Sequence, residues 1–225
     1  MASPVLLTGY EPFGEYETNP SGEIAARLDG HTIDGVELTG VELPVEFERT
    51  TDVLIDRIEA TDPIAVVAMG LAGGRHALCV ERVGINVDDC VSTPDNADHE
   101  PHDERIEPAG PAAYFTSLPA ADIIDTLLDE GIPARLSNTA GTHLCNHLLY
   151  TLQHHLTEAD RAIPAGFIHV PLSSRQAATR AEEAVHGGGV EPSLPLKTQV
   201  AGIELVVEQT IQAAETAESP PAIED

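Results

Sequence analysis

The sequence has no tryptophan and few aromatic residues of any kind, 4% in all. Single-stranded nucleic acids are bound largely by stacking bases on aromatic rings, and duplexes by neutralising phosphates with basic side chains. Lysine is nearly absent too, since Lys197 is the only one beside ten arginines. We therefore expect no binding to nucleic acid and none to an anionic lipid surface.

Cysteine is scarce, and the three that occur, Cys79, Cys90 and Cys145, are widely spaced with no CxxC pair. This excludes the usual zinc-finger spacing and a disulfide framework. The chain also lacks a long apolar run, and its first residues contain no basic segment. Neither a signal peptide nor a transmembrane helix is expected, and we predict a cytoplasmic protein.

Acidic residues, in contrast, are abundant: 38 of them give a formal net charge of −27. They are scattered along the whole chain instead of forming a tail, which argues against an acidic partner-binding segment. A solvated acidic surface with little lysine suits a salt-rich cytoplasm, where ions screen the self-repulsion. We predict a halophilic protein, and this prediction says nothing about the reaction.

Apolar runs alternate with amphipathic segments, which predicts a single α/β domain over residues 1–225. We expect a three-layer α/β/α sandwich around a mostly parallel mixed sheet. The predicted strands are 5–8, 36–44, 63–70, 77–87, 134–137 and 165–170. The predicted helices are 24–28 (capped by Ser21), 47–58, 118–128, 145–155, 177–185 and 205–214. Residues 88–111 are predicted to form a long surface loop, and about the last ten residues to be disordered.

The most informative segment is residues 136–150, in which a short strand, a glycine-containing turn and a helix follow one another. Cys145 falls in the first turn of this helix. There the free N–H groups and the helix dipole favour a thiolate, so we expect a lowered thiol pKa and a nucleophilic sulfur.

Thiol chemistry also needs a base and a group that orients it. His169 ends an apolar strand, and Glu81 interrupts another one, where it either pairs with Arg82 or faces a polar site. Strand ends collect at one edge of a parallel sheet, so we expect the loops after residues 9, 70, 141 and 169 to meet there. Taken singly, each of these residues could equally be structural, and Cys79 and Cys90 are assigned to packing.

Two other readings remain open from the residues alone. A metal-dependent hydrolase could use His143 and His147, spaced four apart on a helix, or ligands in residues 98–103. No acid lies between these histidines as in a HExxH motif, however, and we predict no metal and no cofactor. A phosphate-binding domain of the nucleoside phosphorylase type could use the glycines of residues 70–74, although no P-loop lysine follows them.

Five segments of the sequence, in this order, resemble motifs of the pyroglutamyl-peptidase I (pyrrolidone-carboxylate peptidase) family of cysteine peptidases. They are LLTGYEPFG with NPS (6–14 and 19–21), GLAGGR (70–75), ERVGIN (81–86), NTAGTHLCN (138–146) and GFIHVP (166–171). The resemblance extends over essentially the whole chain. It implies an α/β/α sandwich, often assembled as a homo-oligomer (dimer or tetramer), that removes an N-terminal pyroglutamyl residue from peptides.

The resemblance also implies roles for individual residues. Cys145 corresponds to the nucleophile, His169 to the general base and acid, and Glu81 to the group that orients His169. The positions that correspond to the walls and backbone of the lactam pocket are Tyr10, Phe13, Leu71, His143 and Leu144.

Three departures from the family pattern concern the pocket. Leu71 stands where glutamine is common, His143 stands where phenylalanine is common, and no arginine follows Asp88 and Asp89. The missing arginine leaves open a catalytically weak, pyroglutamate-binding protein.

Overall fold

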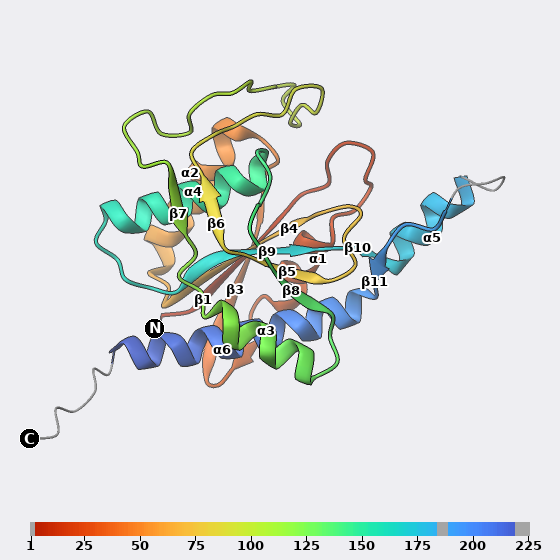
Figure 1. The fold of residues 1–225 in the computed structure, drawn as a ribbon. Helices are drawn as coiled ribbons and strands as arrows, with labels where there is room; N and C mark the ends of the chain where they lie inside the picture. Colours follow the sequence, from red (N-terminus) through yellow and green to blue (C-terminus); the bar gives the residue numbers. More distant parts are fainter. Residues whose placement is uncertain (1–2, 184–188, 219–225) are drawn as a thin grey trace, which may run out of the picture.

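The computed structural model describes residues 3–183 and 189–218, and its centre is a seven-stranded sheet (Figure 1). The strand order is β2-β3-β1-β4-β9-β5-β8. The bounds of these strands are β1 Val5–Tyr10, β2 Thr32–Ile33, β3 Val36–Leu43, β4 Ala65–Leu71, β5 Leu78–Glu81, β8 Ala134–Ser137 and β9 Ala165–Val170. β3, β1, β4 and β9 run parallel, and β4 is apolar and buried throughout because helices cover both of its faces.

Helices cover both faces of the sheet, as expected for the three-layer sandwich. α1, α3 and α6 pack on one face, and α2 and α4 on the other (Figure 1). Each face has its own hydrophobic core, one including Leu7 and Val207 and the other including Leu6 and Phe167. The helices are α1 Pro20–Leu28, α2 Phe47–Thr61, α3 Ala120–Asp129, α4 Leu144–Glu158, α5 Ser174–Glu183 and α6 Leu196–Glu218.

The beginning of α1 shows how closely the layers fit. A Cβ atom on Gly9 would lie 2.1 Å from the backbone oxygen of Ser21, so only glycine lets β1 and α1 approach this closely. The predicted cap was wrong by two residues. Asn19 is the N-cap and its side chain accepts the N–H of Ser21, because Pro20 already takes the first helical position.

The predicted strand 77–87 was also wrong, because it is two strands in different sheets. β5 ends at Glu81, and β6 Val83–Ile85 pairs with β7 Ala113–Phe115 in a separate ribbon against α4. The side chain of Asn146 holds this ribbon to α4, since it accepts the N–H of Ile85 and donates to the Ile85 carbonyl. The polar segment between β6 and β7 is a long loop over residues 86–112, as predicted for 88–111.

Strand direction differs from the expectation at the Cys145 turn. β5 runs antiparallel to β9, and β8 runs parallel to β5, so the end of β8 does not lie at the edge where β1, β4 and β9 end. Ser137 lies beside Glu81, which is opposite Phe167, two residues before His169. The turn 138–143 therefore leads the chain back along the sheet before α4 begins.

The C-terminal part departs from the prediction in length. α5 begins earlier than predicted and α6 starts nine residues earlier, with the short pair β10 Leu172–Ser173 and β11 Ser193–Leu194 between β9 and α6. Residues 184–188 and the end of the predicted disordered tail, 219–225, lie outside the described residues. Within the described ranges, no helix combines the length and apolar character that crossing a membrane requires.

Candidate active site

Cys145 is the second residue of α4, as its position after the turn predicts. The N-cap is His143, and no side chain makes a capping hydrogen bond there. The N–H groups of the first turn of a helix have no intrahelical acceptor, so those of Leu144, Cys145 and Asn146 are directed out of the helix end. This end of the helix can hold an anion.

The sulfur of Cys145 lies over Gly70, the next-to-last residue of β4. A Cβ atom on Gly70 would be 2.9 Å from this sulfur and 2.7 Å from the ring of Phe167. Gly70 is the register partner of His169 on the adjacent parallel strand. Register partners in a parallel pair face the same side of the sheet, about 4.8 Å apart. The thiol and the imidazole therefore lie on the same face of the sheet, over adjacent strands.

Glu81 connects His169 to a second basic group. Its Oε1 lies 2.7 Å from Nδ1 of His169 and 2.6 Å from Nη1 of Arg75. Glu81 is fully buried and His169 is nearly so. Arg82, the neighbour considered as a partner of Glu81, is directed away and donates to Asn138. Glu81 thus faces the polar site, which was one of the two predicted alternatives.

The protonation states of this pair follow from burial and contact. Burial opposes ionisation of Glu81, but its contacts with His169, Ser137 and Arg75 together outweigh burial and lower the pKa of Glu81. Burial lowers the pKa of His169 despite the opposing contact with Glu81. A neutral imidazole with a carboxylate at Nδ1 must carry its proton on Nδ1. Its Nε2 is then free to accept a proton.

The predicted lowering of the Cys145 pKa was wrong. Burial raises the pKa of Cys145 to about 12 and the charge of Glu81 adds to this, while Arg75 and the backbone N–H of Cys145 act in the opposite direction. The cost of desolvating the thiolate therefore outweighs the stabilisation that the N-terminal end of the helix gives it. The resting thiol is protonated, and it needs a base at the moment of attack.

A small cavity of about 30 Å³ opens beside Cys145. All five residues expected to form a lactam pocket line it, together with Cys145, Asn19 and Val45. Most of this lining is apolar. The volume holds about two water molecules, so a larger ring could enter only if a side chain such as the half-buried Phe13 shifts.

Hydrogen bonds fix two walls of this cavity. The hydroxyl of buried Tyr10 donates to the carbonyl of Leu144 at 2.9 Å, and this joins β1 to the first turn of α4. Nε2 of His143 lies 3.0 Å from the carbonyl of Thr93, so this nitrogen is the donor. Burial lowers the pKa of His143, which keeps the ring neutral beside the cavity.

Sequence reasoning missed three residues of the site: Arg75, Asn19 and Val45. Arg75 and Asn19 lie within quoted motifs but carried no assigned role. Val45 has no motif signal. It reaches the cavity because loop 86–112 holds it, with Asn96 donating its N–H to the Val45 carbonyl. The Asp95 carboxylate, from the same loop, accepts the N–H of Phe47 at the start of α2.

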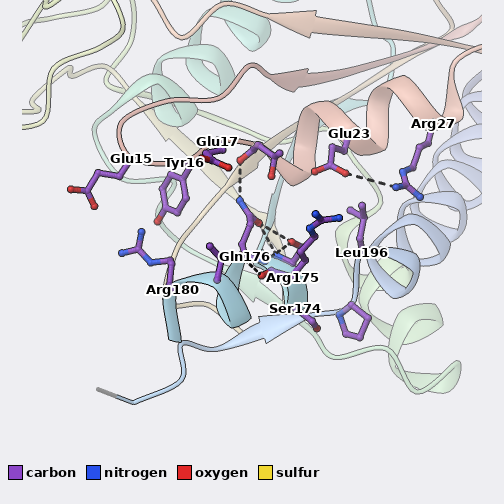
Figure 2. Close-up of a pocket in the computed structure, with 14 residues that line it drawn as sticks. Glu15, Tyr16, Glu17, Glu23, Arg27, Ser174, Arg175, Gln176, Arg180 and Leu196 are labelled. Atoms are coloured by element: carbon purple, nitrogen blue, oxygen red, sulfur yellow. Dashed lines mark hydrogen bonds and ion pairs between the residues drawn. The ribbon is translucent and has the colours of Figure 1, made fainter. Parts of the chain in front are cut away.

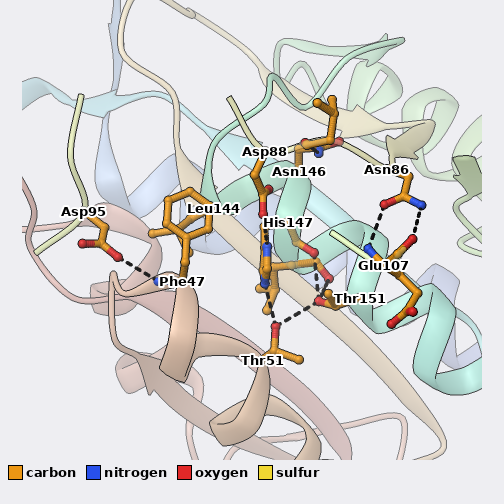
Figure 3. Close-up of polar contacts among 12 residues, drawn as sticks. Phe47, Thr51, Asn86, Asp88, Asp95, Glu107, Leu144, Asn146, His147 and Thr151 are labelled. Atoms are coloured by element: carbon orange, nitrogen blue, oxygen red, sulfur yellow. Dashed lines mark hydrogen bonds and ion pairs between the residues drawn. The ribbon is translucent and has the colours of Figure 1, made fainter. Parts of the chain in front are cut away.

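The same helix, α4, carries a second acid–histidine pair, Asp88 with the partly buried His147 (Figure 3). His147 Nδ1 lies 2.7 Å from Asp88, and His147 Nε2 lies 3.0 Å from the hydroxyl of Thr51. Both ring nitrogens of His147 are thus occupied, and His143 is directed to Thr93. Among the side chains that the structure describes, no three potential metal ligands lie together.

A thiol at a helix end, beside an imidazole whose Nδ1 is held by a buried carboxylate, is the layout of a thiol-dependent hydrolase in an α/β/α sandwich. The comparisons with known proteins define this further. The family model described as pyroglutamyl peptidase matches residues 3–213, and the chain belongs to this family.

Proteins that are similar in sequence over most of the chain are named as pyrrolidone-carboxylate peptidases. The chain is 42% identical over 205 residues to the pyrrolidone-carboxylate peptidase of Bacillus licheniformis, with 91% of each chain covered. It is 44% identical over 207 residues to that of Vibrio parahaemolyticus, with 92% of each covered. The structure of a mutant pyrrolidone carboxyl peptidase from Pyrococcus furiosus is similar, with a TM-score of 0.88 and 36% identity, covering 93% of this chain and 98% of that one.

Proposed function

We propose that this protein is a pyroglutamyl-peptidase I, a cysteine peptidase that hydrolyses the bond after an N-terminal pyroglutamyl residue. The observation that carries the proposal is the Cys145 sulfur over Gly70, the register partner of a His169 bonded to Glu81, in a chain of this family. The relatives named as pyrrolidone-carboxylate peptidases support the same reaction.

In the proposed reaction, the sulfur of Cys145 attacks the pyroglutamyl carbonyl carbon while Nε2 of His169 takes the thiol proton. The N–H groups at the start of α4 hold the resulting oxyanion. The C–N bond then breaks, and His169 gives its proton to the departing amine. Water activated by His169 hydrolyses the thioester, which releases pyroglutamate and restores the thiol.

Glu81 and Arg75 are the positioning residues in this account. The carboxylate of Glu81 holds the imidazole with its proton on Nδ1 and stabilises the imidazolium that forms. Arg75 holds Glu81 and places a positive charge near the sulfur, which supports thiolate formation. Since the arginine common after Asp88 and Asp89 is missing, we propose that Arg75 is the main cationic support of the site.

Substrate selection follows from the cavity. A pyroglutamyl lactam carries no charge, so walls formed by Tyr10, Phe13, Val45, Leu71 and Leu144 accept it without desolvating an ion. An N-terminal glutamate or glutamine would bring an ammonium group into the same apolar space. We propose that it is rejected for this reason.

The test compares coumarin amides of pyroglutamate, glutamine and proline as substrates. The pyroglutamyl amide is expected to be hydrolysed, and the glutaminyl amide to remain intact because of its ammonium group. The prolyl amide matches the ring size but lacks the lactam carbonyl, and serves as the control. Equal rates on all three, or loss of the pyroglutamyl activity with a chelator and its return with Zn²⁺, would overturn the proposal.

We also propose that the protein works in a salt-rich cytoplasm as a homo-oligomer. The charge of −27 with a single lysine supports the first part. Membership of a family whose members are often homo-oligomers supports the second part. Sedimentation in high KCl is expected to give a dimer or tetramer, and a monomer at all concentrations would contradict this.

A further inference from the structure

The protein has a second and much larger hollow, of about 860 Å³, whose lining side chains are drawn in Figure 2. Its walls are residues 15–18, one side of α1, the end of β10 and the first turns of α5. Figure 2 shows Tyr16, Gln176 and Arg175 around this space between α1 and α5. A volume of this size accommodates a drug-sized ligand or several peptide residues.

The hollow and the small cavity share a wall. Phe13 lines the cavity, and its ring packs on that of Tyr16, which lines the hollow, with 5.3 Å between the ring centroids. The hydroxyl of Tyr16 lies over Gly73, two residues after Leu71 of the cavity. Ser173, at the hollow, follows His169 by four residues. The hollow therefore begins where the wall of the cavity ends, at the edge formed by the ends of β1, β4 and β9.

The hollow contains three of the eleven basic residues of this acidic chain, and two of them are engaged. Arg27 pairs with Glu23, and Arg180 pairs with Glu191 while lying over the ring of Tyr16. Arg175 is exposed in the first turn of α5 and forms no ion pair with the side chains that the structure describes, those of residues 3–181 and 189–216. The hollow thus presents an exposed guanidinium group that no described carboxylate engages, in a chain with a net charge of −27.

We propose that this hollow binds the part of the peptide that follows the pyroglutamyl residue, with Arg175 binding a carboxylate of that peptide. The inference rests on the proposed function, because it takes the scissile bond to lie at Cys145. When the lactam ring occupies the small cavity, the rest of the peptide passes over Tyr16 and Gly73 into the hollow. Arginine matches a carboxylate through two parallel hydrogen bonds. The acids Glu15 and Glu17 line the Tyr16 end, so the carboxylate lies farther along, at Arg175.

The test measures kcat/KM for three substrates: a pyroglutamyl tetrapeptide with a free carboxylate, its C-terminal amide, and the pyroglutamyl coumarin amide. A second peptide pair, amidated and with or without a glutamate at the last position, distinguishes a side-chain carboxylate from the terminal one. The variants are Arg175→Ala and Arg57→Ala. Arg57 is an exposed arginine of α2 outside the hollow, and its loss changes the net charge equally.

Arg175→Ala is expected to lower kcat/KM for the carboxylate peptide about fivefold, less for its amide, and to affect the coumarin amide no more than Arg57→Ala does. The loss is expected to shrink at high salt. Thr179→Trp, which places a bulky ring in the hollow, is expected to slow both peptides more than the coumarin amide.

Equal effects of Arg175→Ala and Arg57→Ala on all substrates, with no effect of Thr179→Trp, would overturn the inference while leaving the proposed function intact. Loss that is the same for carboxylate and amide peptides would overturn the role of Arg175. If the unsubstituted protein hydrolysed none of the substrates, the proposed function itself would fail, and the subsite with it.

Discussion

Gly70 and His169 are register partners on β4 and β9, and the sulfur of Cys145 lies directly against the position that a side chain of residue 70 would occupy. The missing Cβ at Gly70 therefore makes room for the sulfur of Cys145 on the face of the sheet that carries His169. A contact of 2.9 Å between the sulfur and a Cβ atom is shorter than van der Waals contact.

Gly70→Ala is expected to lower kcat strongly and to destabilise the fold by about 1–3 kcal/mol, since the new methyl group must displace the sulfur or the Phe167 ring. Thermal unfolding and turnover of the pyroglutamyl coumarin amide measure the two effects. Gly189→Ala is the matched control, because a Cβ atom there meets none of the described residues within 4 Å. Unchanged turnover in Gly70→Ala would contradict the placement of the sulfur.

The pH dependence of kcat/KM is expected to have a single limb between pH 5 and 9. The active form has a neutral His169 and a protonated Cys145. Burial lowers the pKa of His169, so the rate rises with pH at a midpoint below 6.5. It then stays level through pH 9, because the pKa of Cys145 is about 12. A second rise near pH 8 to 9 would indicate that thiolate formation limits the rate and would contradict this account.

The buried groups His169 and Glu81 are also expected to make the free energy of unfolding depend on pH. A histidine whose folded pKa is lowered binds fewer protons when folded than when unfolded, so the free energy of unfolding decreases as the pH falls below about 6.5. The lowered pKa of Glu81 acts in the same direction at lower pH. Urea unfolding at pH 7.5 and 5.5 is expected to give a lower midpoint at the acid pH, and less so in His169→Gln. Equal midpoints in the unsubstituted protein would show that His169 is not buried as a neutral group.

Arg75 offers a sharper test of positioning. Arg75→Gln is expected to lower kcat about tenfold and to move the acid limb to higher pH, because the charge of Arg75 lowers the pKa of His169. Arg75→Lys keeps the charge and is expected to keep the limb in place. Arg82→Gln is the control, since Arg82 is adjacent to Glu81 in sequence but bonds Asn138. If Arg75→Gln lowers kcat but leaves the acid limb of the pH profile unchanged, Arg75 has only a structural role.

Salt is expected to stabilise the protein. With a net charge of −27, self-repulsion is screened as KCl rises, since the Debye length falls from about 10 Å at 0.1 M to about 3 Å at 1 M. The melting temperature is expected to rise by several degrees over this range, and sucrose serves as the uncharged control. A melting temperature that is flat or falls with KCl would contradict a halophilic adaptation.

The sequence was sufficient for the parts of the site that depend on local pattern. The turn before Cys145, the buried strand that contains His169 and the apolar strand β4 each have a clear signature, and the structure has all three elements. Family resemblance added the identity of the cavity residues, and all five of them line one cavity.

Contacts between segments that are distant in the sequence could not be predicted from local sequence patterns. Nothing local shows that β5 and β8 run opposite to β9, or that Arg75 reaches Glu81. The direction of the thiol pKa shift was also predicted wrongly. The position of Cys145 at a helix end can be recognised from the sequence, but the burial of its thiol depends on contacts with distant segments. Loop 86–112 was predicted as a loop, but its contacts with Val45 and His143 depend on the folded chain.

The central claim is that Cys145 carries the pyroglutamyl group during turnover, and one measurement tests it most directly. The protein is mixed with a pyroglutamyl ester, quenched in acid, and each cysteine-containing peptide is weighed by mass spectrometry, alongside Cys145→Ser and Cys90→Ser. The account predicts one pyroglutamyl group on the Cys145 peptide, its persistence in Cys90→Ser, and no turnover in Cys145→Ser. Full turnover in Cys145→Ser, or a pyroglutamyl group on any other residue, would contradict it.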